Sequence, residues 1–254
     1  SRLIAEGVEL RLDAMVEKVW QIGETIHVGM DGQEIEGDVL LVAAGRRPAF
    51  DDLELDKAGV VYSPSGIQVN SRMPTNRRHI YAAGDCAGVY QFTHYAAWQG
   101  FMALRNAYLP LNEKGVLDLV PWSTFTDPEV AHTGLTEAQA RSKFGQGVLV
   151  CNWPLEKVDR PPTDGDATGF VKLIHKANGT ILGVTMAAPR AGEMIQEWSL
   201  AIDQGLKTGA LANSIHVYPT YATASMQVAA DIRVEQILSG TMARVMRGMA
   251  RLAR

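Results

Sequence analysis

Apolar and polar side chains alternate from Val8 to Leu12, and further apolar residues follow up to Val28, which is the pattern of half-buried strands. The apolar members of this pattern are Val8, Leu10, Leu12, Val16, Val19, Ile26 and Val28. Asp31-Gly32 follows directly and is a two-residue hairpin signal. We therefore expect strands within residues 8–30 and a tight turn after them.

Two continuous apolar runs come next, and each is ended by a glycine. Residues 38–45 read Asp-Val-Leu-Leu-Val-Ala-Ala-Gly, and residues 80–84 read Ile-Tyr-Ala-Ala-Gly. This pattern is typical of a strand that is buried on both faces between helices. Residues 50–75 are rich in turn formers, and the apolar spacing from about Thr93 to Ala107 predicts a helix.

The composition changes near Leu109-Pro110 and again at Pro121, and we place a domain boundary there. Beyond it the pattern predicts a strand at residues 122–125, then a helix, three strands, a helix, a loop and a helix. This mixture is typical of an α+β domain.

Local signals locate several of these later elements. Thr136 followed by Gln139 is a capping box at the start of a helix. Asn178-Gly179 is a hairpin turn between two predicted strands. Apolar residues at helical spacing in residues 194–202 predict an amphipathic helix.

Composition narrows the class of protein. The 254 residues are 46% hydrophobic and 20% charged with a net charge of −4, which points neither to nucleic acid nor to an acidic membrane surface. No apolar run nears the roughly 20 residues of a membrane span. The two cysteines, Cys86 and Cys151, exclude a disulfide scaffold and a Cys-based zinc site and favour a reducing cytoplasm. Ser1 opens the chain without an initiator Met and within a helix-like pattern, so we expect a fragment of a longer protein.

Gly84-Asp85 places a carboxylate at the carboxyl end of a predicted strand, where open α/β folds bind ligands. Gly84 allows a ligand to approach the backbone, and Asp85 can accept hydrogen bonds from a polyol. The helix that begins near Thr93 would direct free N–H groups and a partial positive charge at this edge and stabilise negative charge on a ligand bound there. From these residues alone, an Asp85 that merely caps a turn is an equally good interpretation.

Several segments resemble, in order, the class I pyridine nucleotide-disulfide oxidoreductases, the family of dihydrolipoamide dehydrogenase, glutathione reductase and mercuric reductase. Residues 75–85, Thr-x4-Ile-Tyr-Ala-Ala-Gly-Asp, resemble its second flavin-binding motif. Residues 38–48 resemble its connection from the nicotinamide domain back into the flavin domain. Residues 120–137 are similar to the opening of its dimerisation domain, which residues 169–173 and 181–183 continue.

The resemblance implies an α/β remnant of nucleotide-binding domains followed by an α+β dimerisation domain. Residues 1–47 would be the C-terminal part of an NAD(P)-binding domain, residues 48–120 the returning segment of an FAD-binding domain, and residues 121–254 the dimerisation domain. FAD and NAD(P)H are the implied cofactors, and a homodimer is the implied assembly.

The same resemblance assigns candidate cofactor-binding residues. It places Gly84 and Asp85 at the ribityl hydroxyls of the flavin. It places the backbone of Thr93 and His94 beside the pyrimidine edge of the flavin ring. Ala44-Gly45 would lie near the nicotinamide cofactor.

Two features of the family do not occur in residues 1–254: its Gly-x-Gly-x-x-Gly motifs and its Cys-x4-Cys redox pair. A whole enzyme of this type would therefore need a further N-terminal segment of comparable size. Neither Cys86 nor Cys151 has a nearby partner in the sequence, so we expect each to be a small buried apolar side chain rather than a redox centre.

Residues 216–220, His-Val-Tyr-Pro-Thr, occupy the place of the family's His-x-His-Pro-Thr element, which reaches the flavin of the partner subunit. In thiol-disulfide members the second His is the acid/base and a Glu five residues later orients it, whereas this chain has Tyr218 and Thr223. Tyr218 and His216 are our candidate catalytic residues. We do not expect His216, about 7 Å back along an extended segment, to replace the missing base. A packed turn before the last helix is the plainer interpretation of Tyr218.

The leading hypothesis is an FAD-dependent NAD(P)H oxidoreductase that passes hydride through flavin to a metal ion or another small-molecule, non-dithiol acceptor. Tyr also occurs near position 218 in mercuric-reductase-like members, although the Cys pair that ends those members is absent before Arg254. Two alternatives stay open. One is a dimerisation or structural fragment without flavin or turnover, and the other is dihydrolipoamide dehydrogenase, which Tyr218 and Thr223 disfavour.

Two remaining features have plainer interpretations. A stripe of arginines between residues 244 and 254 predicts a basic amphipathic helix, which we expect to pack on its own protein rather than on a membrane. The other histidines have no carboxylate or His at ligand spacing in the sequence and are expected at the surface or in hairpins. They are His27, His79, His132 and His175.

Overall fold

The computed structural model describes residues 2–88, 90–109 and 113–239. The chain divides into two compact units, one ending at Arg47 and one beginning at Pro48. The boundary predicted near Pro121 lies inside the second unit, between α3 and β6.

The first unit is a three-stranded antiparallel meander preceded by a short helix. Its elements are α1 (Arg2–Ala5), β1 (Val16–Ile22), β2 (Thr25–Met30) and β3 (Gln33–Gly37). Asp31 and Gly32 have φ values of 48° and 72° and form the two-residue turn between β2 and β3. The predicted turn is therefore confirmed.

Two strands predicted in this unit are wrong. Residues 8–12 are irregular, and the apolar run at residues 38–45 contains no strand. Val39, Leu41 and Val42 are 87%, 85% and 76% exposed. An apolar run becomes a buried strand only beside partner strands that satisfy its backbone groups, and no described strand pairs with this one.

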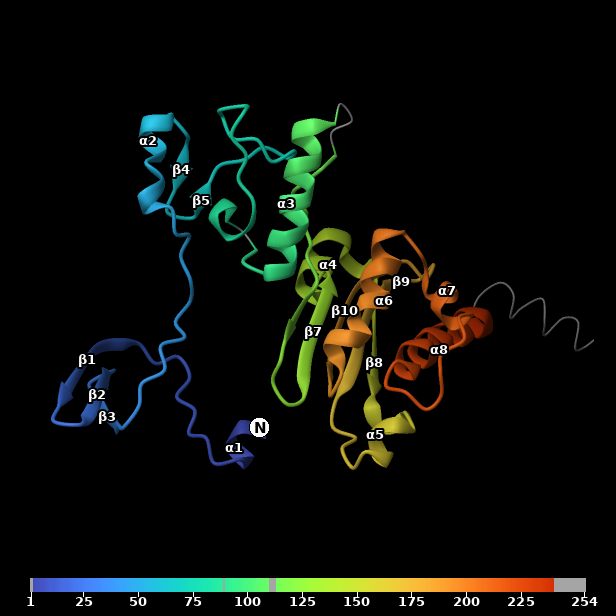
Figure 1. Ribbon diagram of the computed structural model, residues 1–254. Coiled ribbons are helices and arrows are strands. Elements are labelled where there is room, and N and C mark those ends of the chain that lie inside the picture. The colour runs from blue at the N-terminus through green and yellow to red at the C-terminus, as the bar shows by residue number, and fades with distance from the viewer. Residues whose placement is uncertain (1, 89, 110–112, 240–254) are drawn as a thin grey trace, which may run out of the picture. The chain divides into compact units, whose positions relative to one another are not determined.

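The second unit begins with short elements that precede one long helix, α3 (Figure 1). They are η1 (Asp51–Leu53), α2 (Leu55–Ala58), β4 (Tyr62–Ser63), β5 (Gly66–Ile67), η2 (Gly84–Ala87) and α3 (Thr93–Tyr108). The helix predicted from about Thr93 is confirmed. The strand predicted at residues 80–83 is reduced to a single bridge between Tyr81 and Pro74, although Ala82 is buried as expected.

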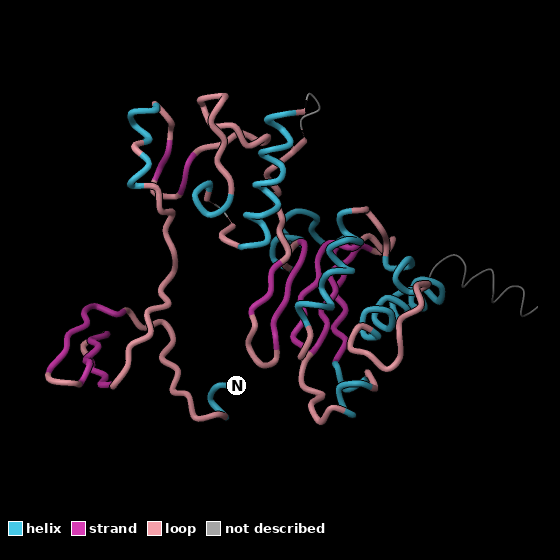
Figure 2. Tube along the Cα trace, viewed as in Figure 1, coloured by secondary structure: helices cyan, strands magenta, loops and turns pink. Residues whose placement is uncertain are grey.

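A five-stranded antiparallel sheet forms the rest of the unit, with strand order β6-β7-β10-β9-β8 (Figure 2). Its strands are β6 (Trp122–Thr124), β7 (Glu129–Gly134), β8 (Val148–Pro154), β9 (Phe170–Lys176) and β10 (Ile181–Ala188). The helical elements are α4 (Glu137–Phe144), η3 (Gly145–Gly147), η4 (Leu155–Lys157), α5 (Arg160–Thr163), α6 (Ala191–Asp203), α7 (Thr208–Ala212) and α8 (Thr223–Ser239).

The predicted order of strands and long helices holds except for β7, and the short helices α5 and α7 were also not predicted. Residues 131–134 of β7 are buried, yet two of them are His132 and Thr133. His132 is accommodated because both of its ring nitrogens have hydrogen-bond partners, Thr185 Oγ1 at 2.8 Å and the Gly134 carbonyl at 3.0 Å.

Local signals placed the neighbouring elements correctly. The backbone N–H of Gln139 donates to Thr136 Oγ1, and Gln139 Oε1 accepts from the Thr136 N–H, which completes the predicted capping box. Asn178 Oδ1 accepts from the backbone N–H and the hydroxyl of Thr180 at 3.1 and 2.8 Å, which closes the β9–β10 turn.

Helices cover both faces of the sheet (Figure 1). Leu173 and Met186 lie on the face that packs against α6 and α8 around the fully buried Trp198. Ile174, the next residue of β9, points to the opposite face and packs against Ala140 of α4. The period of two along β9 therefore supplies a core on each side.

The basic helix predicted at residues 244–254 lies outside the described residues. Among the described helices, none combines the length and the apolar character needed to cross a membrane.

Candidate functional site

The Gly84-Asp85 turn is held against α3 by backbone packing and one buried amide. Gly84 has a φ of +75°, and a Cβ placed on it would lie 2.8 Å from Ala96 Cβ. Its N–H donates to the buried Gln99 Oε1 at 2.9 Å, and Gln99 Nε2 donates to the Gly115 carbonyl at 3.3 Å. Asp85 is half-buried in η2. Glycine at 84 thus brings the turn into direct contact with the helix.

The start of α3 lacks a side-chain cap. Its N-cap residue is Phe92, which has an extended backbone and a side chain without a hydrogen-bond acceptor for the first-turn N–H groups. Thr93 and His94 are exposed, and the first turn contains no acidic residue. The His94 ring stacks on Phe92 and its Nε2 donates to the Pro121 carbonyl at 2.8 Å. The positive end of the helix dipole is therefore accessible at this edge.

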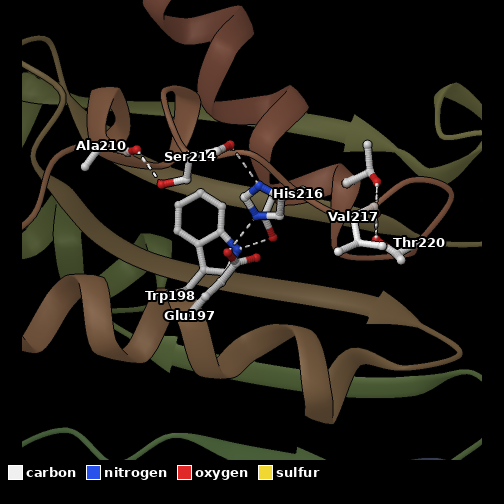
Figure 3. A network of polar contacts seen from close by, with 9 residues as sticks. Glu197, Trp198, Ala210, Ser214, His216, Val217 and Thr220 are labelled. Atoms are coloured by element: carbon white, nitrogen blue, oxygen red, sulfur yellow. Dashed lines mark hydrogen bonds and ion pairs between the residues drawn. The ribbon is translucent and has the colours of Figure 1, made fainter.

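His216 is tied to α6 by an ion-pair contact that the sequence did not reveal (Figure 3). Its side chain is 9% exposed, with Nε2 2.9 Å from Glu197 Oε2. Its Nδ1 lies 3.1 Å from the Ser214 carbonyl. Each ring nitrogen thus faces an acceptor, so both contacts are hydrogen bonds when the ring is doubly protonated. Glu197 Oε1 is buried and has no hydrogen-bond partner among the described residues.

Tyr218 lies on the exposed part of the same α7–α8 connection. It is 68% exposed, and a hydrogen bond with Asp159 together with the charge of that carboxylate raises the pKa of Tyr218 above its usual value. Its phenol is therefore a hydrogen-bond donor at neutral pH and not a base. Thr223, at the start of α8, is buried and its hydroxyl lies 3.3 Å from Thr220 Oγ1.

The predicted site residues fall into three groups. Asp85, Gly84, Thr93 and His94 come together where η2 meets the first turns of α3. His216 and Tyr218 lie on the α7–α8 connection, which is well separated from α3 in the same unit (Figure 1). Ala44 and Gly45 belong to the first unit.

Sequence reasoning missed the residues that hold these groups. Gln99 anchors the Gly84 turn, Glu197 binds His216, and Asp159 binds Tyr218. Gln99 lies six positions after Thr93 on a helix that the sequence predicted, so helical spacing could have placed it on the buried face of that helix. The partners of His216 and Tyr218 are remote in sequence, and no local pattern identifies them.

His79 is exposed and His27 and His175 lie in hairpin strands, as predicted, but three of the four histidines are buried. His27, His132 and His175 are 7%, 6% and 4% exposed, and His27 has carboxylate neighbours across the hairpin. Burial lowers the pKa of His132. Both cysteines are free and half-buried, and burial raises the pKa of the Cys151 thiol.

Two family models match the chain. Residues 1–100 match the model described as pyridine nucleotide-disulphide oxidoreductase, and residues 120–229 match the dimerisation domain of the same proteins. The chain belongs to the class I pyridine nucleotide-disulphide oxidoreductase family. The predicted resemblance and the predicted fold class are thereby confirmed, with the antiparallel sheet and its helices forming the dimerisation domain.

Relatives of the chain within this family differ in their named activity. A mercuric reductase from Bacillus cereus is 38% identical over 226 residues, which cover 87% of this chain and 36% of that protein. A dihydrolipoyl dehydrogenase from Thermus scotoductus is 36% identical over 241 residues, 91% of this chain and 51% of that protein. The crystal structure of LpdA from Mycobacterium tuberculosis is similar with a TM-score of 0.84 and 27% identity over 91% of this chain and 51% of that one. The chain thus spans about half or less of the length of these relatives.

Proposed function

We propose that this chain contributes the flavin-contacting turn and the dimer interface of an FAD-dependent NAD(P)H oxidoreductase. We further propose that its acceptor is a metal ion or another oxidant that requires no thiol base. The observation that carries the first part is the Gly84-Asp85 turn packed against the uncapped start of α3. The observation that carries the second part is Tyr218 in place of a titrating histidine.

The residues at the Gly84 turn fit a flavin. Asp85 would accept hydrogen bonds from ribityl hydroxyls, and the N–H groups at Thr93 and His94 would face the ring edge on which negative charge develops. Bound FAD supplies the step that takes a hydride from the nicotinamide and passes electrons to the acceptor. Ala44-Gly45 would lie beside the nicotinamide cofactor.

The α7–α8 connection supports both the dimer and the choice of acceptor. Ile215, Val217 and Tyr218 are 99%, 77% and 68% exposed, and an exposed apolar stretch of this kind favours association with a second copy. Both groups that could serve as a thiol base already have other hydrogen-bond partners. Tyr218 donates a hydrogen bond to Asp159, and His216 is held between Glu197 and the Ser214 carbonyl.

Flavin occupancy tests the first part. In the full-length protein, Asp85→Ala should weaken FAD binding by roughly ten- to a hundredfold, because a hydrogen bond to a charged group contributes about 1.5–3 kcal/mol. The exposed Asp203 at the end of α6 is a matched control, and Asp203→Ala should leave the flavin absorbance unchanged. Loss of stability in Asp85→Ala with unchanged flavin affinity would instead identify a turn cap. A full-length protein that binds no flavin would favour the structural alternative.

Substrate choice tests the second part. The full-length protein should reduce lipoamide or glutathione disulfide poorly, and Tyr218→His combined with Thr223→Glu should raise that rate. Thr223→Gln combined with Tyr218→His is the control, since it adds similar bulk at a buried position without a carboxylate. Fast dithiol turnover by the unmodified protein, retained in His216→Ala, would overturn the proposed acceptor class.

A further inference from the structure

The β1–β2–β3 meander has one polar face and one apolar face. Two rows of cross-strand neighbours form the polar face: Trp20–His27–Glu36 and Lys18–Gly29–Glu34. The opposite face carries the row Val19–Val28–Ile35. In this unit Val19 of the apolar row is 48% exposed, whereas His27 of the polar rows is buried.

His27 is the fixed member of the polar face. Its side chain is 9% exposed, and its ring stacks on Trp20 with the centroids 5.4 Å apart and 10° between the planes. Nδ1 lies 2.5 Å from Glu34 Oε1 and 3.7 Å from Glu36 Oε1. Stacking and burial therefore hold this nitrogen toward both carboxylates of β3.

We propose that His27, Glu34 and Glu36 bind a divalent transition-metal ion of the Zn²⁺ class. One donor atom from each residue lies within 4.8 Å of the other two. Zinc bonds to nitrogen and oxygen of about 2.0–2.2 Å hold neighbouring donors roughly 3 Å apart. The two separations from His27 Nδ1, 2.5 and 3.7 Å, lie on either side of that spacing.

The two glutamates can complete the coordination by small movements. Their side chains are 50% and 67% exposed, so no packing resists a change of rotamer. Imidazole nitrogen and carboxylate oxygen are both zinc ligands, and three protein donors leave a fourth position for water.

Charge also favours a dication at this place. Glu34 and Glu36, two positions apart on β3, lie beside the single imidazole of His27. A positive charge on that imidazole would balance one of the two negative charges, whereas a divalent ion would balance both. The other cationic group of this face, Lys18, has its Nζ over the Trp20 ring, 4.3 Å from the ring centroid. A metal-free hydrogen-bonded pair of His27 and Glu34 is the alternative that the experiment must separate.

Calorimetric titration of the purified 254-residue chain with Zn²⁺ tests the proposal. We expect one site whose Kd rises at least tenfold in Glu34→Gln combined with Glu36→Gln. These exposed substitutions leave the stacking of Trp20 on His27 in place, so the fold of the meander should survive them. His27→Ala should weaken binding by at least the same factor.

The matched control is His79→Ala, which removes an exposed histidine from the second unit. It should bind Zn²⁺ as the unmodified chain does. Cu²⁺ added as a paramagnetic probe should show nitrogen coupling from one imidazole, and His27→Ala should abolish it. An unmodified chain that binds no Zn²⁺, a double Gln variant that binds it equally well, or a loss of the site in His79→Ala would each overturn the proposal.

Discussion

Gly84→Ala is the substitution whose cost the structure defines most closely. Gly84 is the residue that joins the extended segment at 80–83 to η2, and its φ is +75°. A methyl group on its Cα would lie 2.8 Å from Ala96 Cβ and 3.4 Å from Ala96 Cα. Ala96 belongs to the first turns of α3, so the helix or the turn must move to accept the methyl.

Two terms add to the expected cost. The left-handed conformation costs a residue with a Cβ roughly 1–2 kcal/mol. Carbon atoms prefer separations of about 3.5–4.0 Å, so relief of the contact with Ala96 requires a local shift of the kind that costs about 1–3 kcal/mol in overpacked cores. We therefore expect Gly84→Ala to lower the free energy of unfolding by about 2–5 kcal/mol.

Urea unfolding of the chain, followed by the helical circular dichroism signal, measures this loss. Gly100→Ala is the matched control, because Gly100 lies within α3 and a methyl group on its Cα would have no atom within 4 Å. That variant should gain about 0.5–1 kcal/mol, since alanine favours the helix over glycine. Equal effects of the two substitutions, or a Gly84→Ala variant as stable as the unmodified chain, would show that the close contact between Gly84 and Ala96 does not require glycine.

Four further outcomes are expected. Ser225→Ala should lower the free energy of unfolding in urea by about 1–3 kcal/mol, because Trp198 Nε1 donates to Ser225 Oγ at 2.8 Å in the buried core and would lose its partner. Burial lowers the pKa of His132. The contribution of His132 to stability should therefore be present above about pH 6.5 and be lost as the pH falls below that value. Unfolding curves of His132→Gln should lack this part of the pH dependence. The hydrogen bond from Arg160 is the main cause that lowers the pKa of Asp164, so stability should fall as the pH drops below about 4, less steeply in Asp164→Asn. Light scattering at micromolar concentration should show a dimer, and a monomer would count against the interface proposed above.

Short-range chemistry made part of this fold predictable. Asp31-Gly32 and Asn178-Gly179 form their turns because the residues themselves favour the required backbone, and Thr136 caps α4 with an oxygen three residues from its donor. In each case the interacting groups lie within a few residues of one another.

Contacts between segments that are remote in the sequence could not be predicted from it. The apolar run at 38–45 is a strand only if partner strands accept it, and β7 carries polar residues that are buried because β6 and β10 surround them. Glu197 and His216 are 19 positions apart and meet because α6 and the α7–α8 connection pack on the same face of the sheet. Periodicity and turn chemistry in the sequence determined where most helices and strands begin and in what order they follow one another. The tertiary structure decided which charged side chains meet, because burial and pairing are properties of the packed chain and not of any one segment.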